Sequence, residues 1–193
     1  MQQIQPGFEV EITNALETLR EGGVILYPTD TIWGLGCDAT NASAIQKIYG
    51  IKQRPDTKSL IILLADQRDL LHYVASFDPL VLDFLEAQVR PTTVVYDHGI
   101  HLPDNLLNAD GSIAIRVTKD PFCKTLIKRL RKPLVSTSAN ISGEVSAGSF
   151  YEINALIAES ADYVVDWRRN EDAPALPSQI IKFQNGEPFF LRK

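Results

Sequence analysis

Residues 27–39 read Tyr-Pro-Thr-Asp-Thr-Ile-Trp-Gly-Leu-Gly-Cys-Asp-Ala. They follow the apolar run Val24-Ile25-Leu26 and bring hydroxyls, carboxylates and glycines into one short segment. A strand that ends in such residues presents side-chain donors and backbone N–H groups, and open α/β sheets bind ligands at their strand ends. We therefore expect this stretch to lie in a binding site. Gly34-Leu35-Gly36 alone is a weak signal, because it fits a simple turn.

Two other stretches carry the polar residues expected of such a site. Residues 52–60 read Lys-Gln-Arg-Pro-Asp-Thr-Lys-Ser-Leu, and residues 136–143 read Ser-Thr-Ser-Ala-Asn-Ile-Ser-Gly. Arg54 can hold phosphate oxygens with paired N–H groups, while Lys52 and Lys58 act as point charges. Cations near a loop rich in hydroxyls indicate a site for a polyanion. On spacing alone, a solvated basic loop behind a helix is the stronger alternative.

The serine-rich stretch begins in an apolar strand. Side chains alternate along an extended backbone, so Ser136, Ser138 and Asn140 would point to one side. Such a row can hold phosphate and carboxylate oxygens without titrating. Ordinary turn formation explains the same residue types equally well.

A charged residue stands inside another apolar strand. Arg116 lies in Ala114-Ile115-Arg116-Val117, where a cation is costly to bury without a partner. A substrate carboxylate is one such partner, and an internal Asp or Glu is the other. An internal partner would count against the carboxylate role.

Composition predicts a soluble α/β protein of the cytoplasm. The chain has 193 residues, of which 45% are hydrophobic, a net charge of −5 and a pI near 5.2. These values favour a packed domain and argue against a surface coated with charge for nucleic acid, yet they allow a local basic cleft. Cys37 and Cys123 form no metal or disulfide pattern, which fits a reducing compartment. The N-terminus does not resemble a signal peptide, and no apolar run approaches membrane-spanning length.

The motifs of common catalytic sites are absent. The sequence has no Walker A motif, no full Gly-x-Gly-x-x-Gly and no arguable Ser/His/Asp or Cys/His arrangement. His98 and His101 lack the companions that a metal site needs, so no metal ligands are expected. Charge and hydroxyls without a nucleophile or general base fit phosphoryl-group chemistry that runs by positioning and electrostatics.

Helical and extended patterns alternate along the chain, which predicts an α/β fold. Apolar residues at helical spacing predict a first helix that ends at Gly22-Gly23. Asn41, Asp78-Pro79 and Asp120-Pro121 predict helix starts. Strands are expected at 24–27, 60–65, 92–96, 112–117, 134–137, 163–165, 180–183 and 189–192.

The strand patterns also predict how the sheet is built. Most strands are continuous apolar runs, which implies a sheet covered on both faces. The last two flank Gln184-Asn185-Gly186-Glu187, a hairpin signal that requires antiparallel pairing. Upstream of them, Ser149 and Glu152 fit a capping box at a helix start. We therefore predict a twisted sheet of mixed parallel and antiparallel strands with helices on both faces, in a single domain over residues 1–193.

Together these stretches resemble the YrdC-domain family, and within it the short bacterial threonylcarbamoyl-AMP synthases. The resemblance covers nearly the whole chain, and each motif is weak alone but specific in this order and spacing. The motifs are Tyr-Pro-Thr-Asp-Thr at 27–31, Gly-Leu-Gly at 34–36, Lys-Gln-Arg-Pro at 52–55, Arg116, Ser-Thr-Ser-Ala-Asn-Ile-Ser-Gly at 136–143 and Pro-Ser at 177–178.

The resemblance implies a YrdC-like fold with an open central cleft and a defined reaction. L-Threonine, bicarbonate and ATP would give L-threonylcarbamoyl-AMP and pyrophosphate, for the threonylcarbamoyladenosine of tRNA. By motif position, the implied threonine contacts are Thr31, Arg116, Ser136 and Ser178. The implied ATP contacts are Arg54, Lys58, Ser112, Ser138, Asn140, Ser146 and Arg192. Lys52 and Arg54 would act in catalysis, with ATP as a substrate and Mg²⁺ as its expected companion.

The resemblance also implies partners, namely the proteins that transfer the threonylcarbamoyl group to tRNA. One alternative is a YrdC-like paralogue that binds nucleotide or RNA without making the adenylate, and the intact pairs Lys52-x-Arg54 and Ser138-x-Asn140 count against it. Another is a plain RNA-binding module that uses the cleft and a basic helix, and the acidic net charge counts against it. Weak direct binding of tRNA or double-stranded RNA is left open.

Some positions depart from the family pattern. Arg90-Pro91-Thr92-Thr93 stands where many members have Trp-Pro-Gly-Pro, and Ser59 replaces a frequent Pro. Gln179 stands where a Thr is common, and Leu63 where some longer members carry a His. We expect these changes to leave the anion-binding core intact and to affect details of the threonine pocket.

Overall fold

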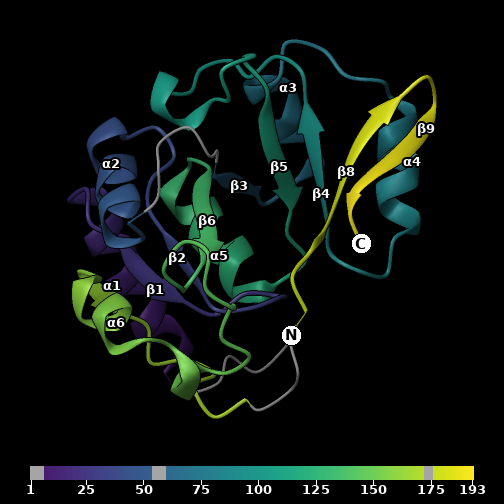
Figure 1. Ribbon diagram of the computed structural model, residues 1–193. Coiled ribbons are helices and arrows are strands. Elements are labelled where there is room, and N and C mark those ends of the chain that lie inside the picture. Colours follow the sequence, from purple (N-terminus) through teal and green to yellow (C-terminus); the bar gives the residue numbers. More distant parts are fainter. Residues whose placement is uncertain (1–6, 54–59, 172–175) are drawn as a thin grey trace.

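One mixed β-sheet runs through the residues that this computed structural model describes, 7–53, 60–171 and 176–193 (Figure 1). The strand order is β7-β1-β2-β6-β3-β5-β4-β8-β9. The pairs β1–β7, β3–β5 and β4–β8 are parallel and the other neighbours are antiparallel, which confirms the predicted mixed sheet. The strands are β1 (Ile25–Tyr27), β2 (Gly34–Gly36), β3 (Ile61–Leu64), β4 (Thr92–Tyr96), β5 (Ile113–Val117), β6 (Leu134–Ser138), β7 (Tyr163–Val164), β8 (Gln179–Gln184) and β9 (Glu187–Arg192).

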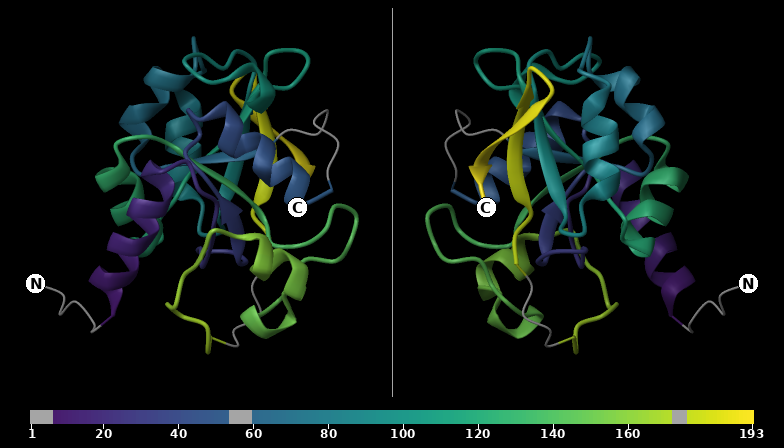
Figure 2. Two further views of the ribbon diagram at one scale, coloured as in Figure 1. Left: turned by 90° about the vertical axis from the view of Figure 1, so that its left-hand side faces the viewer. Right: turned by 90° about the vertical axis from the view of Figure 1, so that its right-hand side faces the viewer.

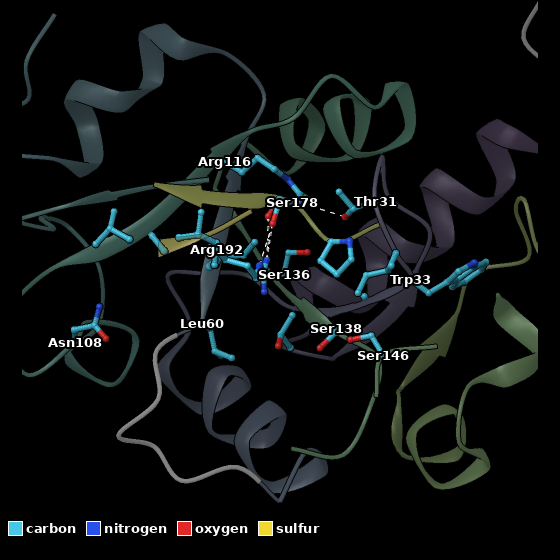
Figure 3. A pocket seen from close by; sticks show the side chains of 18 residues that line it. Thr31, Trp33, Leu60, Asn108, Arg116, Ser136, Ser138, Ser146, Ser178 and Arg192 are labelled. Atoms are coloured by element: carbon cyan, nitrogen blue, oxygen red, sulfur yellow. Dashed lines mark hydrogen bonds between the residues drawn. The ribbon is translucent and has the colours of Figure 1, made fainter. Parts of the chain in front are cut away.

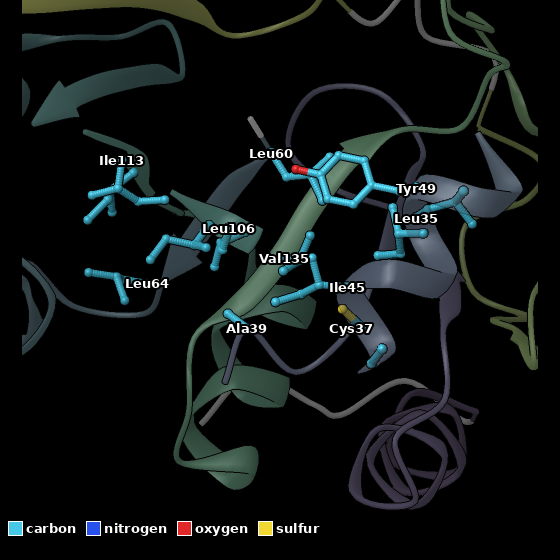
Figure 4. Packing of buried hydrophobic residues seen from close by; sticks show 14 of the residues in the cluster. Leu35, Cys37, Ala39, Ile45, Tyr49, Leu60, Leu64, Leu106, Ile113 and Val135 are labelled. Atoms are coloured by element: carbon cyan, nitrogen blue, oxygen red, sulfur yellow. The ribbon is translucent and has the colours of Figure 1, made fainter. Parts of the chain in front are cut away.

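Helices cover both faces of the sheet, as predicted. On one face, α1 and α5 lie side by side and pack against Ile25, Leu63 and Leu134 (Figure 2). On the other, α2, α4 and α6 contribute to a larger core with Ile62 and Val135, part of which Figure 4 shows. The helices are α1 (Phe8–Arg20), α2 (Ala42–Ile51), α3 (Leu70–Tyr73), α4 (Leu80–Ala87), α5 (Pro121–Leu130) and α6 (Ala155–Ser160), with short 3₁₀ helices η1 (Gln67–Asp69), η2 (Asp104–Leu106) and η3 (Phe150–Glu152). None of these described helices is long and apolar enough to span a membrane.

Helix starts follow the capping residues in the sequence. The Asn41 side chain accepts a hydrogen bond of 3.1 Å from the backbone N–H of Ala44 at the start of α2. At the start of α5, an Asp120 carboxylate oxygen accepts one of 2.9 Å from Cys123 N–H, and Pro121 holds the first helical position. Each cap satisfies an N–H group that the helix itself leaves unpaired.

The predicted capping box at 149–152 is wrong. Glu152 lies in the 3₁₀ helix η3, and its carboxylate accepts a 2.7 Å hydrogen bond from Gly148 N–H, while Ser149 makes no side-chain cap. Helix α6 starts later, where the side chain of Asn154 accepts from Leu156 N–H at 3.0 Å. Asn is as good an N-cap as Ser and stands next to the apolar residues that the helix buries.

The C-terminal hairpin forms where the sequence predicts it. Asn185 and Gly186 connect β8 to β9 with φ angles of 53° and 79°. Positive φ at both central residues defines the turn whose twist matches a two-residue hairpin. This antiparallel pair lies at one end of the sheet beside α4 (Figure 1).

The Gly34-Leu35-Gly36 segment is a strand, and its interpretation as a turn is wrong. It pairs antiparallel with both β1 and β6. A Cβ on Gly36 would lie 2.6 Å from Tyr27 Cε1 and 2.6 Å from the Val135 carbonyl oxygen. Glycine is needed here because β2 runs directly against the buried Tyr27 ring.

Replacement of Gly36 by Ala should therefore destabilise the protein by about 1–3 kcal/mol, the usual cost of overpacking a core. Gly50→Ala is the matched control, since a Cβ on this α2 residue meets nothing within 4 Å and Ala is the better helix former. Chemical denaturation of both variants gives the comparison. Equal stabilities would contradict the close packing of Tyr27 against β2.

Candidate functional site

A cleft of about 340 Å³ lies on the sheet face that α1 and α5 only partly cover. Its lining comes from β2 to β6, β8, β9 and the segment before β2. On β6, Leu134 packs against the helices, and Ser136 and Ser138 continue the same face into the cleft. The polar residues thus begin where the helical cover ends.

The predicted residues Thr31, Arg116 and Ser136 line this single cleft. Ser138, Ser146, Ser178 and Arg192 line it as well, and Figure 3 shows Arg116, Thr31, Ser178 and Arg192 close together. Its position differs from the sequence-based expectation, which placed it beyond the strand ends. The cleft lies across the face of the sheet, where Ala114 and Arg116 of β5 and Ser136 and Ser138 of β6 line it.

Arg116 has an internal partner. Its side chain is 3% exposed, and Nη2 lies 3.2 Å from an Asp30 carboxylate oxygen. Nη1 donates a hydrogen bond of 3.2 Å to the Thr31 hydroxyl. An internal ion pair was one of the two alternatives for this residue, and its presence counts against Arg116 as the residue that binds a substrate carboxylate. The pair instead holds residues 30 and 31 against β5.

The Thr31 hydroxyl belongs to an ordered chain of hydrogen bonds. Thr29 Oγ1 accepts from Thr31 N–H at 3.0 Å and donates to the Ile32 carbonyl at 2.8 Å. Because the Thr29 proton is used in this way, the 2.9 Å contact between the two hydroxyls has Thr31 as donor. Thr31 therefore offers an acceptor to the cleft, suited to an N–H group of a ligand.

The wall formed by Ser178 and Arg192 is cationic. Arg192 donates from Nε and Nη2 to the Ser178 carbonyl at 3.1 and 2.8 Å. Burial lowers the pKa of Arg192, and repulsion from Arg116 and Arg90 lowers it further. Within the described residues the charged side chains of the lining are Arg116 and Arg192, and no carboxylate lines the cleft. An anionic ligand would relieve this repulsion.

The predicted catalytic position of Lys52 is not supported by its surroundings. Lys52 is 1% exposed and is not among the lining residues. Its ammonium group donates to the carbonyl oxygens of Ser138 and Asn140, the latter at 2.7 Å. A buried ammonium is stable only with such acceptors. Lys52 thus holds the backbone of the turn after β6 in place, including the carbonyl group of Ser138.

Asn140 and Ser112 also lie outside the lining. β6 ends at Ser138, so alternation stops before Asn140, and its amide donates to the carbonyls of Ile141 and Glu144 at 2.9 and 2.7 Å. Ser112 accepts a 2.9 Å hydrogen bond from the side chain of Asn108, which does line the cleft. Arg54 and Lys58 lie outside the described residues.

Part of the lining was not predicted from the sequence. Trp33 lines the cleft, and its ring centroid lies 4.8 Å from that of Phe150. Its position in the opening motif, two residues after Thr31, was a signal in the sequence that could have identified it. Asn108 lies in a loop without a recognisable motif. The remaining missed residues are apolar strand residues that only the folded sheet brings to the cleft, such as Leu60, Val95 and Ile180.

If Lys52 supports the turn after β6, then Lys52→Met should lower the free energy of unfolding by about 2–4 kcal/mol. The carbonyl oxygens of Ser138 and Asn140 would lose their charged donor and stay buried. Lys47→Met is the control within α2, the helix that Lys52 follows, because the Lys47 side chain is 53% exposed. Urea unfolding compares them. A Lys52→Met protein of unchanged stability but lost activity would instead favour the catalytic role.

Comparisons with known proteins agree with this fold. The family model described as "Telomere recombination", which represents the Sua5, YciO and YrdC proteins, matches residues 17–193. The "Threonylcarbamoyl-AMP synthase" of Pseudoalteromonas translucida is 36% identical over 181 residues, 92% of this chain and 96% of that protein. The protein of the same name from Idiomarina loihiensis is 34% identical over 170 residues, 86% and 90% of the two chains.

Solved structures show the same architecture. Escherichia coli YciO is 26% identical, with a TM-score of 0.80 over 98% of this chain and 91% of that one. Pyrococcus abyssi Sua5, solved with L-threonine, is 24% identical with a TM-score of 0.82 over 99% of this chain. This chain spans 55% of that longer chain. The fold class is that of the YrdC-like α/β proteins. The chain belongs to the Sua5/YciO/YrdC family.

Proposed function

We propose that this protein is an L-threonylcarbamoyladenylate synthase, a nucleotidyltransferase that makes threonylcarbamoyl-AMP and pyrophosphate from L-threonine, bicarbonate and ATP. The observation that carries this proposal is a cleft whose described lining holds Arg192, the Asp30-paired Arg116 and several hydroxyls but no Asp or Glu side chain. Its substrates bear a carboxylate, a carbamate and a triphosphate, which need such donors. The name shared by the curated relatives supports the same activity.

The reaction needs positioning more than it needs a protein nucleophile. The carbamate oxygen of N-carboxythreonine attacks the α-phosphorus, the new O–P bond forms, and the bond to the pyrophosphate oxygen breaks. Thr31, Ser136 and Ser178 are proposed to hold the threonine part, with Thr31 accepting from the carbamate N–H. Holding both reactants in one cleft removes the entropic cost of their encounter.

The ATP part is assigned to the other hydroxyls of the cleft and to the cations near them. Ser138, Ser146 and Arg192 line the cleft, and Arg54 and Lys58 are proposed from motif position to bind phosphates. Ser112 and Asn140 would act indirectly, through Asn108 and the turn after β6. Arg54 remains the proposed catalytic cation, because it can stabilise charge on the leaving pyrophosphate.

Mg²⁺ is proposed to enter with ATP. The described residues hold no group of three or more His, Cys, Asp or Glu side chains suited to a metal, and no carboxylate lines the cleft. The described residues therefore do not offer a carboxylate cage, and the phosphate oxygens would be the main ligands. When bound, the ion would neutralise charge on the triphosphate.

We place this activity in the cytoplasm, with tRNA threonylcarbamoyl-transferase proteins as the acceptors of its product. The alternative is a YrdC-like paralogue that binds nucleotide or RNA without synthase activity. The acceptor hydroxyl of Thr31 and the cationic wall at Arg192 favour the synthase, because they complement N–H and anionic groups on one small substrate. Direct tRNA binding is a separate proposal.

The purified chain, given ATP, Mg²⁺, bicarbonate and labelled threonine, should form threonylcarbamoyl-AMP and release an equal amount of pyrophosphate. Little pyrophosphate should appear when threonine or bicarbonate is omitted, because the attacking carbamate is then missing. Chromatography of the labelled adenylate checks the product. Pyrophosphate release indifferent to threonine, or nucleotide binding without turnover, would favour the paralogue.

Replacement of Arg116 by Lys should raise the threonine concentration needed for half-maximal rate by about tenfold, because one ammonium cannot keep Asp30 and Thr31 in place together. Threonine-dependent pyrophosphate release measures the effect, and thermal unfolding reports on the fold. If Arg116 were only a structural partner of Asp30, the variant would lose stability and keep its threonine dependence.

A further inference from the structure

Thr93 is a buried hydroxyl next to the cleft that the proposed reaction has not used. It stands in β4 two residues before Val95, so its side chain points to the cleft face of the sheet. Its exposed fraction is 0%. Thr93 Oγ1 lies 2.9 Å from Ser178 Oγ, and this is its one side-chain hydrogen bond to the described part of the chain.

The surroundings decide which hydroxyl donates. If Ser178 were the donor, the Thr93 proton would be buried without an acceptor, which is the costly outcome. Arg192 Nη2 donates to Ser178 Oγ at 3.4 Å and uses one of the two lone pairs of that oxygen, which leaves the other lone pair for the Thr93 proton. The need of the buried Thr93 proton for an acceptor therefore favours Thr93 as donor and Ser178 as acceptor, which leaves the Ser178 proton for the cleft that Ser178 lines. Figure 3 shows Ser178 beside Arg192 in this cleft.

We propose that Thr93 is a positioning residue that makes Ser178 a hydrogen-bond donor to a carboxylate or carbamate oxygen of the substrate. The inference rests on the proposed function, since it takes threonine as the ligand of this wall. Thr93 does not line the cleft itself and acts through Ser178. The Ser178 hydroxyl proton and the N–H groups of the neighbouring Arg192 make this wall a set of donors, which selects anionic oxygens over amino groups.

Thr92 offers a matched control one residue away. Thr92 is also buried, and its hydroxyl accepts from the Gln179 side chain at 2.6 Å and donates to the Arg90 carbonyl at 2.9 Å. Neither Thr92 nor Gln179 lines the cleft. Thr92→Val thus removes a buried hydroxyl from the same strand without changing the donors in the cleft.

The test compares threonine binding to the whole chain by calorimetry, together with kcat and the threonine KM for pyrophosphate release. Thr93→Val keeps the side-chain shape but removes the donor that orients the Ser178 hydroxyl, and it should weaken threonine binding and raise KM by up to about tenfold, the value of a well-oriented hydrogen bond to a charged group. Thr93→Ser should restore wild-type binding, and Thr92→Val should bind threonine normally. Thr93→Ala serves in place of Thr93→Val should the latter fail to fold.

A double-mutant comparison shows whether Thr93 acts through Ser178. Thr93→Val with Ser178→Ala should bind threonine no more weakly than Ser178→Ala alone. Additive losses, or wild-type affinity in Thr93→Val, would overturn the inference while leaving the proposed function in place. A wild-type chain that binds no threonine would overturn both together.

Discussion

A guanidinium buried in the face of a β-sheet is the constraint on which this site depends. Arg116 stands in β5 where an apolar residue would otherwise pack, and its charge needs a carboxylate close by. Asp30 supplies it from the segment between β1 and β2. That segment is therefore held over the sheet, which brings Thr31 and Trp33 to the rim of the same cleft. The same ion pair thus allows the arginine to be buried and positions residues of the cleft.

Local signals in the sequence were sufficient for most of the fold. The caps at Asn41 and Asp120 and the Asn185-Gly186 turn act over a few residues, and each forms as predicted. Gly34-Leu35-Gly36 was misjudged because glycine disfavours strands unless a neighbour needs the space, and that neighbour, Tyr27, lies across the sheet. The capping box failed because Asn154, a competing cap, lay closer to the apolar residues of α6.

The part of the site that lies on a single strand could be predicted from side-chain alternation. Alternation along β6 located Ser136 and Ser138 and failed at Asn140, where the strand has ended. The catalytic role of Lys52 stays a prediction, and its surroundings could not be predicted: a lysine after a helix is usually solvated, and only the fold reveals the carbonyls of Ser138 and Asn140 around this one. The partner of Arg116 was likewise undecided, since an ion pair and a ligand contact leave the same pattern in a sequence.

The origin of the cleft lining has a kinetic consequence. Residues from Thr31 to Arg192 contribute to it, and β6 pairs with β2 across about a hundred residues of chain. Contacts so distant in sequence form slowly, because loop closure must come before they stabilise the chain. The binding surface is therefore incomplete on a nascent chain until the final hairpin has left the ribosome and docked. Because only the finished fold can bind, substrate binding would protect the chain against global unfolding and proteolysis.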